Sequence, residues 1–154
     1  MNWIKLLAFS LGLPLLMTQA QAVEEMQLNR ESIKTNKRLI VNANMDLTEE
    51  QANGFCPIYS EYQAEIGKIN TRSFELINSY ISQYDSLDDK TAKNMIKEYL
   101  QIEQDRLDLR KSYVKKFDKV LPTPKVIRYL QIENRLDSII DHEMLDRIPL
   151  AVSE

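Results

Sequence analysis

Two side chains in this sequence have the chemistry of a redox or metal site, and each type occurs once: Cys56 and His142. None of the residues one helical turn from Cys56 is basic, so no neighbouring cation would stabilise a reactive thiolate. Cys56 is therefore either a small buried apolar residue or an unpaired thiol that links a homodimer or responds to oxidants. Both interpretations stay open at the level of the sequence.

His142 is a weak candidate for a metal ligand. It stands between Asp141 and Glu143, with Asp146 one helical turn further on. One imidazole among carboxylates is a poor transition-metal site without softer ligands, and a solvated acidic face explains the same residues. The sequence also has no nucleophile elbow, no glycine-rich phosphate loop and no pair of metal-binding histidines. We therefore expect neither enzymatic activity nor a cofactor.

The composition is that of one globular domain. The 154 residues are 44% hydrophobic and 28% charged, with three Gly, five Pro and one Cys. The net charge of −3 lacks the positive excess that drives association with phosphate backbones. Nucleic acid is therefore not an expected partner.

Residues 1–22 have the pattern of a cleaved signal peptide. A lysine precedes an apolar run that ends at Met17, and Ala20-Gln21-Ala22 supplies the small residues of a cleavage site. The apolar run is interrupted by a proline and is shorter than the ~20 residues that a spanning helix needs. We expect cleavage before Val23 and localisation in the periplasm. Because this segment carries one lysine and no acid, the mature chain has 132 residues and a net charge of −4.

A positively charged stretch interrupts the acidic chain between residues 106 and 128. It holds eight Lys or Arg against Asp108 and Asp118, a local charge of +6 that leaves −10 on the rest of the mature chain. These cations form either a solvated face near a helix C-terminus or a docking surface for acidic proteins or an anionic membrane surface. The candidate interaction surface, in which two aromatic rings add apolar contact, is Arg106, Arg110, Lys111, Tyr113, Lys115, Lys116, Phe117 and Lys119.

The clearest helix start in the chain is Leu47-Thr48-Glu49-Glu50-Gln51. The side chains of Thr48 and Gln51 can each bond the other residue's amide as a capping box. After it, apolar residues recur at alternating steps of four and three, a period of seven that is typical of a helical bundle or coiled coil. The predicted seam is Phe55, Tyr59, Tyr62, Ile66, Ile69, Ser73, Leu76 and Tyr80.

Two further helices are predicted, from about Asp88 to Val120 and from the N-cap Thr123 to about Ile148. The apolar stripe of the first of them includes Met95, Tyr99, Ile102, Leu109, Tyr113 and Phe117. Because the connection before that helix is short, it should pack antiparallel to its predecessor. We therefore predict an all-α protein, an antiparallel helical hairpin or bundle of three to four long helices. The chain divides into the signal peptide 1–22, a weak helix (about 24–40) and an Asn-rich linker within 23–46, the bundle domain 47–150 and a tail 151–154.

A short internal repeat links the last two predicted helices. Tyr-Leu-Gln-Ile-Glu occurs at 99–103 and again at 129–133, and Arg-Leu-Asp follows each copy, at 106–108 and 135–137. Two copies are too few for a solenoid. Similar helices meeting similar packing demands explain the repeat, and so would a helix duplication or a Gln/Glu polar layer shared by the two helices.

The start at Leu47, Thr48 and Gln51, in an exported helical chain, resembles the LTxxQ (Spy/CpxP-like) family of periplasmic proteins. In that family the motif opens a long helix of a helical hairpin, and members act as ATP-independent chaperones or restrain an envelope-stress sensor. The chain also resembles a group of small exported bacterial helical proteins of unknown function. The likeness lies in Phe-x-Pro-Ile-Tyr-x-x-Tyr at 55–62, Tyr-Leu-Gln-Ile-Glu-Asn-Arg-Leu-Asp at 129–137 and Ile-Pro-Leu at 148–150. This second resemblance implies a shared helical fold and transfers no activity.

The sequence therefore favours a non-enzymatic periplasmic protein that binds other envelope proteins, as a stress adaptor or ATP-independent chaperone. Its partners would be unfolded clients or a membrane sensor. The alternative is a signalling accessory that senses a metal through His142 or a redox state through Cys56.

Overall fold

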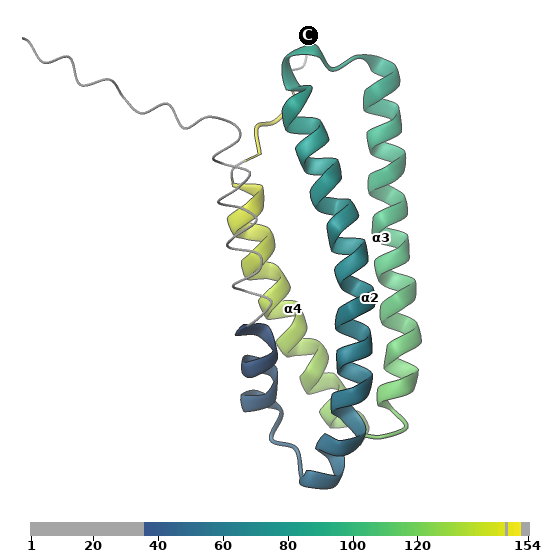
Figure 1. The fold of residues 1–154 in the computed structure, drawn as a ribbon, viewed down its shortest axis with the longest axis vertical. Coiled ribbons are helices and arrows are strands. Elements are labelled where there is room, and N and C mark those ends of the chain that lie inside the picture. The colour runs from purple at the N-terminus through teal and green to yellow at the C-terminus, as the bar shows by residue number, and fades with distance from the viewer. Residues whose placement is uncertain (1–35, 147, 152–154) are drawn as a thin grey trace, which may run out of the picture.

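The computed structural model describes residues 36–146 and 148–151, and this part of the chain is all-α (Figure 1). A helical segment covers residues 36–45. It is followed by α2 (Glu49–Ser82), the short 3-10 helix η1 (Tyr84–Ser86), α3 (Asp89–Phe117) and α4 (Thr123–Leu145). α2 and α3 pack antiparallel as a hairpin, which confirms the predicted fold class. The predicted signal peptide and its cleavage site lie outside the described residues.

Both helices of the hairpin begin at the caps that the sequence predicts. Thr48 Oγ1 accepts a hydrogen bond from the Gln51 amide at 3.3 Å, and Gln51 Oε1 accepts one from the Thr48 amide at 3.2 Å. Leu47, ahead of this capping box, is partly buried against the core. The Asp88 carboxylate caps α3 by accepting from the Thr91 amide at 2.7 Å. These bonds satisfy amides that a helix leaves without partners in its first turn.

An aromatic cluster fills the core where α2 begins and α3 ends. The ring centroids of Phe55 and Phe117 are 5.3 Å apart, and those of Phe117 and Tyr129 are 4.7 Å apart. Tyr59 and Tyr62 complete the cluster, and all five side chains are at most 4% exposed. Contacts of this geometry contribute ~0.5–1.5 kcal/mol each beyond the area they bury. The cluster therefore holds α2, α3 and α4 together at this end of the molecule.

The predicted linker over residues 41–46 is wrong, because residues 36–45 are helical. Lys37, Val41 and Met45 recur every four residues on one face, and each is at most 7% exposed. Their burial outweighs the low helix propensity of the asparagines between them. Leu39 and Ile40 of the same segment are exposed. The rest of the predicted first helix, residues 24–35, lies outside the described residues.

The turn between α3 and α4 lies against the start of α2. A Cβ atom added at Gly54 would stand 3.0 Å from the Cβ of Val120, so the absence of a side chain permits this close approach. α4 begins at Thr123, one residue earlier than predicted. The Val126 amide donates to the Pro122 carbonyl at 3.3 Å, so Pro122 occupies the cap position predicted for Thr123.

α4 covers only part of the hairpin. Its 23 residues span ~35 Å, whereas the 34 residues of α2 span ~51 Å. α4 starts beside the C-terminal end of α3 and leans away from α3 along the other side of α2 (Figure 1). Arg110 on α3 pairs with Asp137 on α4 at 3.6 Å, and in the described chain no earlier residue of α3 forms an ion pair or side-chain hydrogen bond with α4. The N-terminal half of α3 therefore has α2 as its main neighbour.

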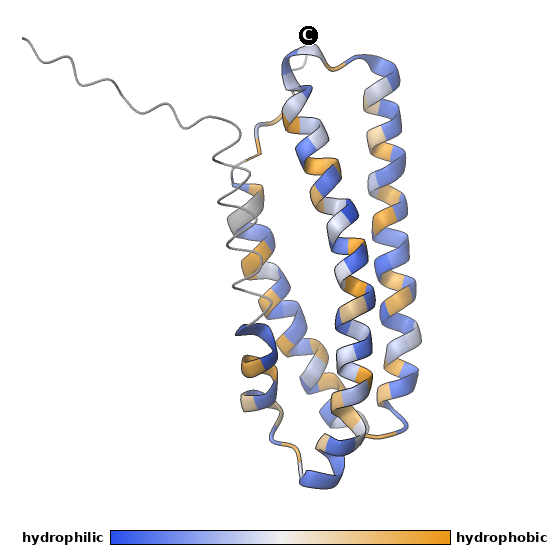
Figure 2. Cartoon of the chain, in the orientation of Figure 1, coloured by the Kyte–Doolittle hydropathy of each residue, from blue (hydrophilic) through white to orange (hydrophobic). Residues whose placement is uncertain are grey.

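Apolar and polar residues are interspersed along all three long helices (Figure 2). Among the described helices, none combines the length and the apolar character needed to cross a membrane.

Candidate functional site

A second series of residues with the spacing of a bundle seam runs along α3. Its steps alternate between four and three residues, so its members share one face of the helix. The series comprises Ile96, Leu100, Glu103, Leu107, Arg110, Val114 and Phe117. α4 covers the C-terminal end of this series, because Phe117 contacts Tyr129 and Arg110 pairs with Asp137. The N-terminal end has no comparable cover within the described chain.

Three of the four residues at the uncovered end of the series are exposed apolar side chains, and the charged Glu103 stands between two of them. The exposed fractions are 60% for Ile96, 59% for Leu100 and 46% for Leu107, and the neighbouring Tyr99 is 56% exposed. We call these four residues the open α3 face. A single exposed apolar residue is ordinary on a protein surface, whereas several on one helix face make that face a candidate contact site.

The internal repeat lies in two different environments. In the second copy, Tyr129 and Glu133 are buried in the core at 1% and 2% exposure. In the first copy, Tyr99 is 56% exposed and Glu103 lies at the surface. A polar layer shared by the two helices, one of the alternative explanations of the repeat, does not form, because Glu133 bonds to α2 and to the segment 36–45. The first copy therefore has the sequence of a core-facing helix without a core around it.

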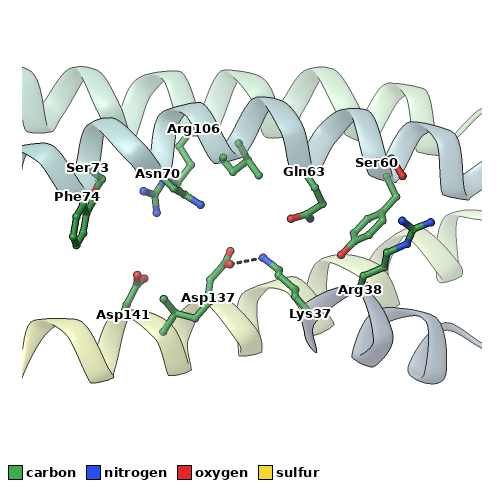
Figure 3. Close-up of a pocket in the computed structure, with 14 residues that line it drawn as sticks. Lys37, Arg38, Ser60, Gln63, Asn70, Ser73, Phe74, Arg106, Asp137 and Asp141 are labelled. Carbon is green, nitrogen blue, oxygen red and sulfur yellow. Dashed lines mark hydrogen bonds and ion pairs between the residues drawn. The ribbon is translucent and has the colours of Figure 1, made fainter. Parts of the chain in front are cut away.

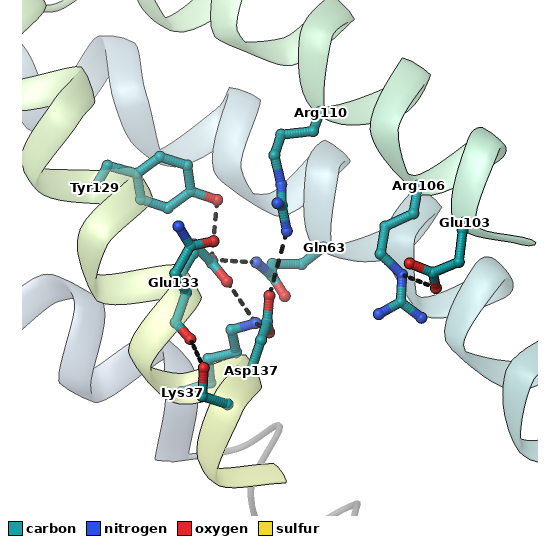
Figure 4. A network of polar contacts seen from close by, with 10 residues as sticks. Lys37, Gln63, Glu103, Arg106, Arg110, Tyr129, Glu133 and Asp137 are labelled. Atoms are coloured by element: carbon teal, nitrogen blue, oxygen red, sulfur yellow. Dashed lines mark hydrogen bonds and ion pairs between the residues drawn. The ribbon is translucent and has the colours of Figure 1, made fainter. Parts of the chain in front are cut away.

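A buried polar network joins the first helical segment to α2 and α4 (Figure 4). The Lys37 ammonium contacts the Glu133 carboxylate and lies 2.8 Å from Asp137 Oδ1. Glu133 Oε1 also accepts hydrogen bonds from Gln63 Nε2 at 2.8 Å and from the Tyr129 hydroxyl at 2.9 Å. A buried charge is tolerated only when it is paired and hydrogen-bonded. This network therefore fixes the position of the helical segment 36–45.

Lys37 keeps its positive charge at neutral pH. Burial by itself lowers the pKa of Lys37, but the carboxylates of Glu133 and Asp137 outweigh burial and hold this pKa above its ordinary value. Burial raises the pKa of the Tyr129 hydroxyl, and the charge of Glu133 raises it further. Lys37 therefore stays charged and Tyr129 stays neutral, which suits a structural contact and not a proton-transfer site.

The structure separates the residues of the predicted basic interaction surface. Tyr113 and Phe117 are buried in the core, at 4% and 1% exposure, so they offer no apolar contact to a partner. Arg106 and Arg110 turn inward from α3 (Figure 4). These four residues therefore do not form the mixed basic and aromatic surface that the sequence suggests.

The lysines of the same stretch are less buried. Lys116 pairs with Glu61 at 3.0 Å, and the hydrogen bond that Lys116 donates to this carboxylate raises the pKa of Lys116. Lys111 pairs with an acidic residue of its own helix, and Lys115 and Lys119 are exposed. Binding of a partner by these lysines stays a prediction.

Cys56 and His142 are far apart in the sequence, and the fold does not bring them together in one site. Cys56 is partly buried against the core, and the Ser60 hydroxyl donates to its carbonyl at 2.9 Å. His142 is exposed, with Nε2 3.6 Å from a carboxylate oxygen of Asp146. In the part of the chain that the structure describes, no three His, Cys, Asp or Glu side chains gather as metal ligands. A redox role of Cys56 and a metal role of His142 stay predictions.

The predicted stripe of α3 combines two faces of the helix. Ile102, Tyr113 and Phe117 are buried as expected, but Tyr99 is exposed. The step of four from Ile96 to Leu100 is the signal in the sequence for a second, separate series. The spacing does not show whether another helix covers this second series, because that depends on the direction of α4.

Comparisons of the chain with protein-family models, with curated proteins and with solved structures found no match. The family resemblances inferred from short motifs therefore stay predictions. The fold and the open α3 face define a helical hairpin with a third helix that leaves part of one seam exposed.

Proposed function

We propose that this protein is a non-enzymatic periplasmic protein that binds other envelope proteins on the open α3 face. It acts as an ATP-independent chaperone for unfolded clients or as an adaptor for a stress sensor. The observation that carries this proposal is the row of Ile96, Leu100 and Leu107, which continues the seam that α4 covers further along α3. The signal-peptide pattern of residues 1–22 supports the periplasmic location.

The row suits an amphipathic segment of a partner. A partner helix with apolar residues at steps of three and four would extend along α3 the kind of contact that α4 makes at Phe117. Lys93 and Lys111 flank the row at one turn from Ile96 and Leu107, so their long aliphatic stems can add contact area while their charges stay in water. An apolar row edged by lysines binds many sequences, which fits a chaperone or adaptor better than a single-substrate site.

The proposal is tested with an unrelated client protein that aggregates when it unfolds. Light scattering should show that the wild-type protein slows aggregation at near-stoichiometric amounts. The variant Ile96→Ser/Leu100→Ser should lose most of this protection, because it removes the two most exposed aliphatic side chains of the row.

The matched control is Ile127→Ser/Ile139→Ser on α4, which removes two isoleucines of similar exposure, 52% and 56%. This control should protect as the wild type does. Equal loss in both variants would show that general surface hydrophobicity, not the open α3 face, causes the protection. No protection by a several-fold excess of the wild type would rule out the chaperone form of the proposal.

A further inference from the structure

A cavity lies between α2 and α4, where the helical segment 36–45 and one side chain of α3 complete its wall (Figure 3). None of the residues of the open α3 face lines it. Its volume is about 320 Å³, at the lower end of the ~300–1,000 Å³ typical of sites for small organic molecules. This size favours a ligand as small as an amino acid over one as large as a nucleotide.

Arg106 and Asp141 face this cavity from different helices without forming an ion pair. Arg106 reaches the cavity from α3, and Asp141 reaches it from α4 (Figure 3). The Nε atom of Arg106 is buried and has no hydrogen-bond partner in the described chain. The carboxylate paired with it, Glu103 on the same helix, is 3.8 Å away, which is too long for a hydrogen bond. A buried donor of this kind is unfavourable until an acceptor reaches it.

Asp141 is the corresponding anion in the cavity wall. Its side chain is partly buried, and within the described residues this side chain forms neither an ion pair nor a hydrogen bond. Burial raises the pKa of Asp141, as expected for a carboxylate that has lost water without gaining a direct cation contact. Asp137, its neighbour in the cavity wall, differs because Lys37 and Arg110 already pair with it.

The remaining wall limits the kind of ligand. Ile66, Phe74 and Ile140 provide apolar surface. A ligand with two negative charges would meet Asp137 and Asp141, and a ligand with two positive charges would meet Arg106 and the nearby Arg38. A ligand with one charge of each sign and a short apolar group can pair with Arg106 and Asp141 and also contact the apolar side chains of the wall.

We propose that this cavity binds a small zwitterion with an apolar side chain, the class to which free amino acids belong. The ligand carboxylate pairs with the guanidinium of Arg106, whose planar fork matches two carboxylate oxygens. The ligand ammonium pairs with Asp141, and the apolar group packs on Ile66 and Ile140. This site is independent of the open α3 face, so either proposal can fail without the other.

The test is isothermal titration of the purified protein with the common L-amino acids. At least one apolar amino acid should bind at millimolar or lower concentration. Its analogues that lack the ammonium or the carboxylate should bind at least tenfold more weakly. For leucine these analogues are isocaproate and isoamylamine. Arg106→Gln and Asp141→Asn should each weaken binding at least tenfold, whereas Lys119→Gln, which removes an exposed cation outside the cavity, should leave it unchanged.

A second measurement keeps the test independent of how well the variants fold. In the wild-type protein, the amino acid should shift the NMR signal of the Arg106 Nε–H group and slow its exchange with solvent. Three results would overturn the proposal: no amino acid binds at millimolar concentration, the analogues bind as well as the amino acid, or the Arg106 signal is unmoved by a ligand that does bind.

Discussion

The substitution Lys37→Met removes the one cation that contacts the buried Glu133 carboxylate in the described chain. Methionine keeps most of the aliphatic stem of Lys37, so the packing of the helical segment 36–45 is largely preserved. Asp137 keeps its ion pair with Arg110. Glu133, only 2% exposed, is left as a buried anion without a cation.

The expected loss follows from the contacts that remain. Removing one partner of a buried ion pair costs ~3–5 kcal/mol of the free energy of unfolding. Glu133 retains hydrogen bonds from Gln63 and Tyr129, so we expect a loss at the lower end of this range, about 3 kcal/mol. With a urea m value of about 2 kcal/mol per molar, the unfolding midpoint should fall by about 1.5 M.

Urea unfolding of the purified protein, followed by circular dichroism, measures this loss. Lys93→Met is the matched control, because Lys93 forms an exposed ion pair with Asp89 and its removal should not change the midpoint measurably. The double variant Lys37→Met/Glu133→Gln should lose less than the sum of its two single variants, since the unpaired anion is gone. A loss below about 1 kcal/mol for Lys37→Met would refute the buried network as the anchor of the segment.

The raised pKa of Lys37 determines how its contribution to the free energy of unfolding changes with pH. A group whose pKa is higher in the fold stabilises the fold fully below its unfolded pKa, about 10.4 for lysine. That contribution is lost as the pH rises through the folded value. The stability difference between the wild type and Lys37→Met should therefore be full at neutral pH and shrink only in strongly alkaline solution.

Four further predictions concern single positions. Gly67→Ala should raise the free energy of unfolding by about 0.5–1 kcal/mol, because nothing lies within 4 Å of the added Cβ. Gly54→Ala should not show this gain, because its added Cβ would lie 3.0 Å from the Cβ of Val120. Equal urea midpoints for the two variants would contradict the close packing of that turn. Thr48→Ala should cost about 1 kcal/mol in the same assay by removing the capping bond, and an unchanged midpoint would contradict the cap. Edman sequencing of the protein recovered from the periplasm should begin at Val23, and a start at Met1 would exclude cleavage.

The sequence predicts those features of the fold that depend on local pattern. The capping box at Thr48 and the aromatic seam from Phe55 to Ile66 both follow from spacing, and both are present. The first helical segment was harder to predict, because Val41 and Met45 are flanked by asparagines that disfavour helix. Only their burial against the rest of the fold, together with Lys37, explains why this segment is helical.

The candidate site depends on long-range geometry that no spacing reveals. The copies of the internal repeat have the same five residues at their start, yet Tyr129 is buried and Tyr99 is exposed. The difference arises from the direction of α4, which covers the C-terminal half of α3 and leaves the N-terminal half open. The pairing of Arg110 with Asp137, like the approach of Arg106 and Asp141 to one cavity, joins residues from separate helices and has no local signal.

Site-specific photo-crosslinking in living cells tests the proposed binding face most directly. A photoreactive amino acid is placed at Leu100 in the open α3 face and, as a control, at Ile127 on α4, since the two sites are similarly exposed. Crosslinks to other envelope proteins should form from Leu100 and be absent or much weaker from Ile127. Many different proteins would identify a chaperone, and one membrane sensor would identify an adaptor. No crosslinked protein from Leu100, or equal crosslinking from both positions, would contradict the open α3 face as the site where this protein binds its partners.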